Sequence, residues 1–405
     1  MIRKIITFSA HNRALVLFLT LLTVIGAWYA TKTIHLDALP DLSDTQVIIY
    51  ARWDRSPDVV EAQVTTPTVR TLMGAPKVKT IRAVTDYGTA FVYVIFEDQT
   101  DLYWARSRIS EYMSRLRAGI PADARLEIGP DATGLGWVYQ YVVKDETGKA
   151  DLEKLRALQD FTIKYQLLSV PGVAEVASVG GFQKQYQISI DPVRLRASGI
   201  SLATVVEKVR SSNSQAGARL LEINGAEYMI RSQGYLKSKA DISEIGIGSD
   251  EAGNAVTLRS VATINEAPAL RRGVTDYMGQ GDAVSGVVVM RQNENAYEVI
   301  GRVKEKVQGI KKFLPPGITL VPVYDRSELI EHSISNLKIK LIEEMLIVAL
   351  VILVSLGHFP SAIVPILTIP IAVLISFIPL NLFGVSSNIM SLAGIAISIG
   401  VLVDG

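Results

Sequence analysis

The chain has 405 residues, with 41 basic and 40 acidic side chains and a formal net charge of +1 at pH 7. This balance argues against a nucleic-acid-binding protein, which would carry a basic excess or a basic stripe. The sequence contains no cysteine, so disulfides and thiolate metal sites are excluded, and soft-metal chemistry would need methionine, histidine or carboxylates.

The first predicted element is a membrane-spanning helix. The run Ala14–Thr31 carries no charge, and a helix of that length, rising about 1.5 Å per residue, nearly crosses a hydrocarbon core of about 30 Å. Arg3, Lys4 and Arg13 precede it, so the positive-inside rule places the N-terminus in the cytoplasm. The alternative is a cleaved signal peptide with small residues at Ala27–Ala30. The run is long for a signal peptide, and further apolar segments follow.

The middle of the chain alternates strand-like and helical segments. In chain order these are a strand at Gln46–Arg52, a helix at Ser56–Leu72 with Pro57 at its start, strands at Val78–Val84 and Phe91–Phe96 around a turn at Tyr87-Gly88, a helix at Asp101–Leu116 with Asp101 as its N-cap, and a strand at Ala124–Ile128. The order βαββαβ is that of a ferredoxin-like domain.

The same pattern recurs later in the chain. Leu72–Val78 resembles Leu167–Val173, and each segment lies between a helix and a strand. A helix at Gly301–Leu314 and a strand at Ile318–Val323 repeat the end of the first pattern. We therefore expect a second βαββαβ unit from about 133 to 325, divided by an insertion at about 182–271 with a helix near Leu202–Arg210. Two such units could enclose a ligand cleft, and the alternative is a docking platform without a ligand.

The C-terminal region is predicted to be a second membrane segment. Met345–Val403 contain no Asp, Glu, Lys or Arg, with breaks at Gly357–Pro360 and Pro379–Asn388. Three spans follow, at roughly 337–357, 361–380 and 388 onward, which places residues 32–336 outside the cytoplasm. The last stops short of the ~20 residues that a span needs, so we expect the chain to be a fragment of a longer membrane protein.

Asp404 is the strongest candidate for a functional residue. It ends an apolar run deep in a span, where an acid is costly and usually relays protons or ions. Ala393, Ala396 and Gly400 lie on the same helical face and would let another helix deliver a partner, such as a lysine. The alternative is an acid at the membrane edge.

Other candidate ligands are weaker. Met390 lies near the outer end of the same span and could offer a thioether to a soft cation, although a lone membrane methionine more often packs. Met278 and Met290 are interpreted in the same way. The histidines share no metal-ligand spacing.

An acidic cluster follows the first span, at Asp37, Asp41 and Asp44. Pro40 and Ser43 beside these residues favour a solvated turn over a cation site. The sequence has no Walker loop, nucleophile motif or HExxH element, so we expect neither ATP hydrolysis nor proteolysis, and no bound cofactor.

Six segments together resemble the heavy-metal branch of the resistance–nodulation–division (RND) transporters. They occur in order along the whole chain: Asp37–Leu42, Tyr103–Arg106, Gly129–Gly134, Val176–Gly181, Tyr324–Ser327 and Asn388–Leu392. The resemblance implies an α+β membrane protein with ferredoxin-like periplasmic porter subdomains at 37–132 and at 133–181 plus 272–330. It also implies an inserted docking subdomain at 182–271, a cytoplasmic N-terminus and first membrane helix at 1–36, and further membrane helices at 331–405.

The resemblance also implies a function. Members of the family are proton-driven secondary transporters of the bacterial inner membrane, not enzymes. They work as trimers that join a periplasmic adaptor and an outer-membrane channel, and Asp404 falls on their proton-coupling acid.

The branch bears on the substrate. Cobalt–zinc–cadmium exporters usually carry an acid where this chain has Ser398, and a glutamate where it has Trp137. Both differences from the cobalt–zinc–cadmium exporters favour the copper/silver type, with Cu⁺ or Ag⁺ as the transported ion. Met390 matches a methionine of that type's ion route. Leu270 and Leu402 stand at two positions where that type is expected to have methionines. The alternatives are a divalent-cation or multidrug exporter of the same architecture and, from another class, a protein-export accessory.

Overall fold

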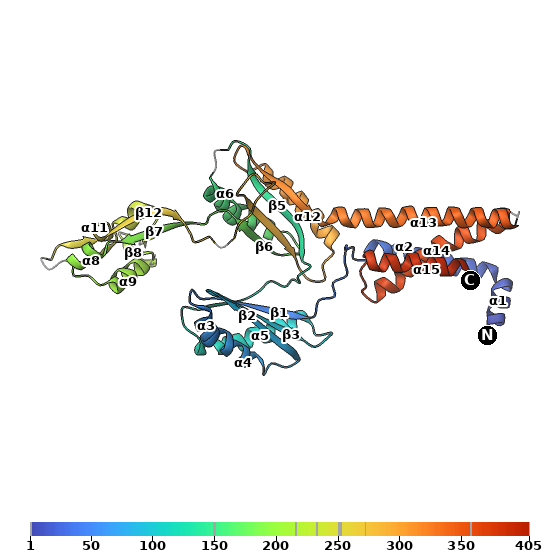
Figure 1. Ribbon diagram of the computed structural model, residues 1–405, viewed down its shortest axis with the longest axis horizontal. Coiled ribbons are helices and arrows are strands. Elements are labelled where there is room, and N and C mark those ends of the chain that lie inside the picture. The colour runs from blue at the N-terminus through green and yellow to red at the C-terminus, as the bar shows by residue number, and fades with distance from the viewer. Residues whose placement is uncertain are drawn as a thin grey trace. The chain divides into compact units, whose positions relative to one another are not determined.

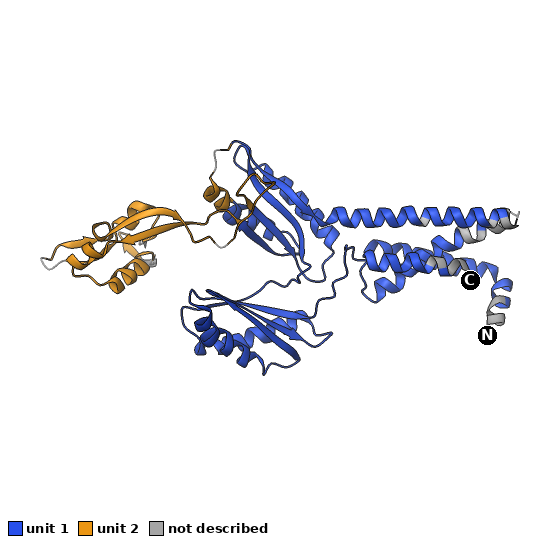
Figure 2. Cartoon of the chain, viewed as in Figure 1, with its two compact units in different colours: residues 1–147, 159–179, 285–405 blue, residues 148–158, 180–284 orange. Residues whose placement is uncertain are grey.

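The computed structural model describes residues 2–148, 151–214, 217–231, 234–249, 253–271, 273–356 and 359–404. The chain divides into two compact units (Figure 2). The first comprises residues 1–147, 159–179 and 285–405, and the second residues 148–158 and 180–284. The second unit is therefore built mainly from a segment inserted into the first. It also contains residues 148–158, 180–181 and 272–284, which lie outside the insertion expected at 182–271.

The first sheet of the first unit is antiparallel, with strand order β2-β3-β1-β4. Its strands are β1 (Gln46–Arg52), β2 (Val78–Asp86), β3 (Thr89–Phe96) and β4 (Arg125–Ile128). Side chains alternate across a strand, so Val47, Ile49 and Ala51 of β1 share one face and are buried. Gly88, with φ of 69°, makes the tight turn between β2 and β3.

Helices cover the buried face of this sheet (Figure 1). They are α3 (Pro57–Val60), a π-helical turn at Glu61–Thr65, α4 (Thr66–Leu72), α5 (Leu102–Leu116) and a 3₁₀ turn at Arg117–Gly119. The predicted caps are confirmed, because Pro57 starts α3 and the carboxylate of Asp101 accepts a hydrogen bond from the Trp104 amide at 2.7 Å. The predicted helix at Ser56–Leu72 is correct in extent, but its middle turn is π rather than α.

The second sheet has the order β14-β5-β13-β6. Its strands are β5 (Trp137–Asp145), β6 (Val173–Gly180), β13 (Val284–Met290) and β14 (Ile318–Asp325), and its helices are a π-helical turn at Gln159–Ile163, α7 (Lys164–Leu168) and α12 (Ala296–Lys311). A βαββαβ order is thus present twice, and both sheets place the first strand in the same position between the third and the fourth.

Apolar helices complete the first unit: α1 (Ile2–His11), α2 (Arg13–Thr33), α13 (Arg326–Leu356), α14 (Phe359–Leu382) and α15 (Ile389–Asp404). α14 packs against α2, α13 and α15 (Figure 1). α13 follows β14 directly and is unbroken over 31 residues, because residues 326–356 contain no glycine or proline to interrupt a helix. Of the predicted break at Gly357–Pro360, residues 357 and 358 lie outside the described residues, and Phe359 and Pro360 begin α14.

Among the described residues, α2 is the one helix that is long and apolar enough to cross a membrane by length and composition. Leu367–Leu382 and Ile389–Ser398 are shorter apolar helices. The single span predicted near the N-terminus therefore has a matching helix, whereas the three later spans are not established by this criterion.

Among its described residues, the second unit contains three antiparallel strand pairs: β7 (Lys184–Ile190) with β12 (Ala262–Pro268), β8 (Gly217–Ile223) with β9 (Ala226–Arg231), and β10 (Gly246–Ser249) with β11 (Ala255–Thr257). Its helices are α6 (Leu152–Leu158), α8 (Pro192–Ala197), α9 (Leu202–Ser212), α10 (Lys239–Ser243) and α11 (Leu258–Val261). Val205, Ile247 and Leu258 are at the centre of its core.

Candidate functional site

The start of α15 is held by Asn388, which is 3% exposed. Its side-chain Oδ1 accepts hydrogen bonds from the amides of Met390 and Ser391, each at 3.0 Å. Asparagine is favoured at this position because it pairs amides that have no partner in the first helical turn. The Ser391 hydroxyl in turn donates to the carbonyl of Ser386 at 3.1 Å. The N-terminus of α15 is therefore fixed by its own sequence.

The two predicted site residues lie at opposite ends of this helix. Met390 is in its first turn, with 63% of the residue exposed. Asp404 is its last residue, and the side chain of Asp404 lies outside the described part of the structure. About 14 residues, or roughly 21 Å of helical rise, separate them. The helix does not bring the two residues into one site.

The face of α15 predicted to admit another helix is open where it is described. Ala393 is exposed and Ala396 half-buried, and the surroundings of Gly400 are not described. Leu392 and Ile395, on the other side, are 6% and 7% exposed, and α15 packs against α13 and α14. A further helix could therefore approach α15 along its small residues.

A cavity of about 310 Å³ lies between α14 and α15. Apolar side chains and three serines line it, at Ser376, Ser391 and Ser398. The Ser398 hydroxyl donates to the carbonyl of Ile395 at 2.7 Å. The position at which divalent-cation exporters are expected to carry an acid thus holds a neutral group bonded to its own helix.

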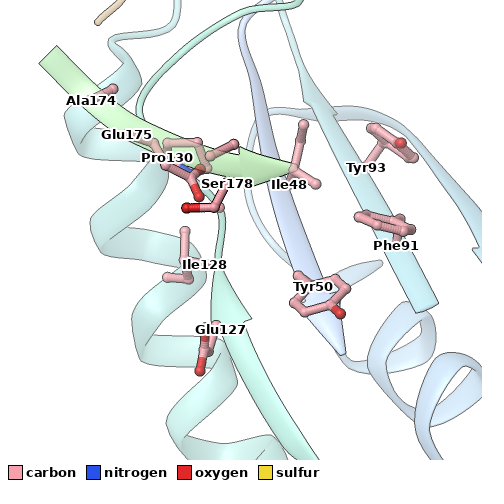
Figure 3. A pocket seen from close by; sticks show the side chains of 12 residues that line it. Ile48, Tyr50, Phe91, Tyr93, Glu127, Ile128, Pro130, Ala174, Glu175 and Ser178 are labelled. Carbon is pink, nitrogen blue, oxygen red and sulfur yellow. The ribbon is translucent and has the colours of Figure 1, made fainter. Parts of the chain in front are cut away.

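A larger cavity, of about 890 Å³, lies between the first sheet and β6. Tyr50 of β1 and Phe91 and Tyr93 of β3 project into it from the sheet (Figure 3). The rings of Tyr50 and Phe91 have centroids 5.1 Å apart. Glu127 and Glu175 add two carboxylates to the lining. This cavity matches the cleft expected between the two α/β units.

The acidic cluster after α2 does not form one site. Asp41 accepts a hydrogen bond from the Thr133 hydroxyl at 2.7 Å, and the carboxylate of Asp44 lies 3.9 Å from the ammonium of Lys79. Asp37 differs from the predicted solvated turn, because its side chain is only 17% exposed and lies 3.5 Å from the guanidinium of Arg326. Arg326 belongs to one of the six resembling segments, but nothing in its local sequence indicates that it pairs with Asp37.

The electrostatics of Asp37 are dominated by burial. Loss of solvent raises the pKa of its carboxyl above the ordinary value of 3.8, and the opposing effects of Arg326 and of the Ala38 and Leu39 amides do not cancel this rise. The contact with Arg326 would by itself suggest a lowered pKa. Burial outweighs this contact, since the ion pair is long at 3.5 Å.

Within the described ranges, no group of three or more His, Asp or Glu side chains is arranged to hold a metal ion. His11 and His35 are exposed, Met278 is 78% exposed in the second unit, and Met290 is 7% exposed at the end of β13. Trp137 is 55% exposed at the start of β5.

Comparison with known sequences identifies relatives of the whole chain. Residues 5–405 match the family described as AcrB/AcrD/AcrF. The chain is 47% identical over 406 residues both to the putative cation efflux system protein SilA of Salmonella typhimurium and to the cation efflux system protein CusA of Escherichia coli K12. It is 32% identical over 417 residues to the cobalt-zinc-cadmium resistance protein CzcA of Cupriavidus metallidurans. These alignments cover 100% of this chain but only 39%, 39% and 38% of the relatives, so the chain spans about two fifths of their length.

Solved structures of a related protein have the same fold as this chain. Two crystal forms of a heavy metal efflux pump superpose with TM-scores of 0.86 and 0.88 at 28% identity, covering 98% and 99% of this chain and 40% of those chains. The fold is therefore that of an RND efflux pump. The chain belongs to the AcrB/AcrD/AcrF family, the RND group of secondary transporters, and the predicted resemblance is confirmed.

Proposed function

We propose that the whole protein carrying this chain exports heavy-metal cations, with Cu⁺ or Ag⁺ as its substrate. The observation that carries the proposal is the 47% identity, over the full chain, to two proteins named as cation efflux proteins. The lower identity of 32% to a cobalt-zinc-cadmium resistance protein supports a substrate outside the divalent group. The neutral Ser398 in the cavity beside α15 supports the same choice.

Export would be driven by protons taken up at Asp404. A carboxylate at the end of a helix as apolar as α15 has a high cost, which protonation removes. The neutral and charged forms would favour different packings of α15 against its neighbours, so protonation would shift the bundle between two states. Met390, exposed at the other end of the helix, would offer a thioether to a soft monovalent cation on its route.

The architecture would be that of a multi-pass protein of the bacterial inner membrane. α2 would be the first span, and α13, α14 and α15 would contribute the next three within the lipid bilayer. The two sheets with their helices would form periplasmic porter subdomains at 37–132 and at 133–181 plus 272–330. The inserted segment 182–271 would dock a periplasmic adaptor and an outer-membrane channel. No nucleic acid would be a partner.

A homotrimer is supported by the β8–β9 hairpin. Its side chains include Leu220, Tyr228 and Met229, which are 57%, 56% and 77% exposed. A two-stranded hairpin with apolar groups in water has little stability of its own. Contact with a second copy would remove this apolar surface from water.

A second candidate function is the export of organic molecules, and the cavity on the first sheet favours it. An aromatic wall of Tyr50, Phe91 and Tyr93 with two nearby carboxylates suits an organic cation. The two candidates differ in a growth test. Expression in a strain without metal efflux should raise tolerance to silver and copper salts, and Asp404→Asn should abolish the gain. Tolerance to cationic dyes without tolerance to metals would favour the second candidate.

A further inference from the structure

Residues 35–38, which follow α2 and which we call the link, are joined to the start of α15 by a short parallel ladder. Three backbone hydrogen bonds form it: the Ser387 amide to the His35 carbonyl at 2.8 Å, the Asp37 amide to the Ser387 carbonyl at 3.2 Å, and the Ile389 amide to the Ala38 carbonyl at 3.1 Å. Ser387 is 4% exposed and Ala38 is fully buried. Since Ser387 and Ala38 are buried, water cannot readily replace their hydrogen bonds, and α15 cannot shift along its axis without pulling the link with it.

The other edge of the link meets α12. The Leu36 amide donates to Oδ1 of Asn295 at 3.4 Å, and the Tyr297 amide donates to the Leu36 carbonyl, also at 3.4 Å. Asn295 is the N-cap of α12, because the same oxygen accepts the Glu298 amide. Leu36 therefore lies between the first turns of two helices, one in the apolar bundle and one that covers the second sheet.

An ion pair fixes the link to α13. The Asp37 carboxylate lies 3.5 Å from the Arg326 guanidinium, whose other nitrogen donates to the Trp137 carbonyl of β5 at 2.9 Å. Arg326 is 6% exposed, and a buried charge is stable only while it is paired. The two residues that flank Arg326 in the sequence contact α12, because Lys304 pairs with Asp325 and donates to the Ser327 hydroxyl at 2.7 Å. α12 and α13 are thus also connected directly, about two turns further along α12 than the link.

We propose that the link is the connection through which movement of α15 reaches α12 and α13, with Asp37 and Arg326 as positioning residues. The proposal rests on the proposed function, since it requires α15 to move when Asp404 exchanges a proton. Coupling of this kind travels through contiguous hydrogen-bonded elements and rigid helices, and the link supplies such a path. Three of the six resembling segments, which are far apart in the sequence, meet at the link and share this role. They are Asp37–Leu42, Tyr324–Ser327 and Asn388–Leu392.

The first test separates coupling from folding. The whole protein is placed in vesicles, and proton uptake and cation efflux are measured together for wild type, Arg326→Gln and Arg326→Lys. Arg326→Gln leaves Asp37 without its cation, so we expect the number of ions exported per proton to fall by roughly 5- to 150-fold, the range typical of allosteric coupling. Arg326→Lys keeps the charge and should restore part of the ratio.

The matched control is Arg55→Gln, which removes an ion pair of the same 3.5 Å length with Asp123, both partners being more than half exposed. It should leave the ratio of ions to protons unchanged. A purely structural role for Arg326 would lower proton uptake and ion efflux in parallel, and that result would overturn the proposal.

The second test does not depend on the stability of a charge variant. The chain has no cysteine, so Leu36→Cys with Ser387→Cys introduces one defined pair on adjacent backbones, which lie about 4.8 Å apart in paired strands and so within disulfide reach. If the link moves with α15, the oxidised protein should transport as well as the reduced one. Transport that stops on oxidation and returns on reduction would show that the ladder opens during the cycle, and the proposal would be wrong.

The role of the link and the proposed function are contradicted by different results. Wild-type transport with an unchanged ratio in Arg326→Gln would contradict the link alone. A wild-type protein that moves no cation, whether Ag⁺, Cu⁺ or Zn²⁺, would overturn the proposed function and, with it, the link that rests on it.

Discussion

Gly286 of β13 faces the ring of Tyr141 of β5 so closely that a Cβ at position 286 would lie 2.3 Å from the Cζ atom of that ring. Tyr141 is fully buried, and its hydroxyl donates to Oε1 of Gln159 at 2.9 Å. The hydrogen bond holds the ring in place, so the ring cannot easily swing away from an added methyl group. Because residue 286 has no side chain, the ring of Tyr141 can pack directly against the backbone of β13.

Gly286→Ala should therefore destabilise the protein by about 1–3 kcal/mol, the usual cost of overpacking a core. Thermal unfolding of the purified protein would show a lower midpoint. Gly301→Ala is the matched control, because a Cβ at 301 in α12 meets nothing within 4 Å. Alanine there should raise stability by about 0.5–1 kcal/mol, since glycine is unfavourable within a helix. Equal midpoints for the two variants would contradict the packing argument.

The cap of α15 gives a second prediction. Asn388→Ala removes the acceptor for the Met390 and Ser391 amides, and loss of such a cap costs about 0.5–2 kcal/mol. Hydrogen exchange at those two amides should be faster in the variant. Asn388→Ser keeps a capping oxygen and should restore most of the protection, whereas unchanged exchange in Asn388→Ala would show that the cap is dispensable.

The pKa of Asp37 gives a pH-dependent prediction. Because burial raises this pKa above 3.8, the folded protein binds the proton more tightly than the unfolded chain does. The contribution of Asp37 to stability is therefore fully present below pH 3.8 and is lost as the pH rises through the raised pKa. Asp37→Asn cannot ionise, so the stability of the variant relative to wild type should increase with pH across that interval. A relative stability that falls with pH would mean that the ion pair with Arg326 outweighs burial.

The exposed hairpin of the second unit predicts an effect on assembly. Met229→Lys places a charge on the apolar surface proposed to meet another copy, so the trimer should weaken while the fold of each chain is kept. Sedimentation of the detergent-solubilised whole protein would measure this. Glu222→Lys on the same hairpin is the control, because Glu222 lies opposite Glu227 and the change replaces a repulsion by an attraction. An unchanged trimer in Met229→Lys would argue against this surface as the contact.

Local structure could be predicted where the pattern of side chains is itself local. β1 has the predicted bounds Gln46–Arg52, because its β-branched and aromatic residues are a signal contained in the segment itself. The caps at Pro57 and Asp101 were recognisable for the same reason. The π-helical turns at Glu61–Thr65 and Gln159–Ile163 were not predicted, because no short-range signal distinguishes them from α-helix.

The candidate site was predictable in part. Asp404 and Met390 stand out because a charge and a thioether are unusual in an apolar run, although their roles stay predictions. The pairing of Asp37 with Arg326 could not be foreseen, since the two residues are distant in the chain and each is ordinary in its own segment. Proline and serine near Asp37 suggested a solvated turn, and contacts with Arg326 at the start of α13 and with Ser387 before α15 overrode that local preference.

The central claim is that the protein couples proton entry at Asp404 to cation export. The most direct measurement is Ag⁺ efflux from vesicles that contain the whole protein under an imposed proton gradient, for wild type and Asp404→Asn, with Zn²⁺ run in parallel. We expect wild type to move Ag⁺ and not Zn²⁺, and Asp404→Asn, which cannot exchange a proton at this position, to move neither. Ag⁺ efflux as fast in Asp404→Asn as in wild type would contradict the account.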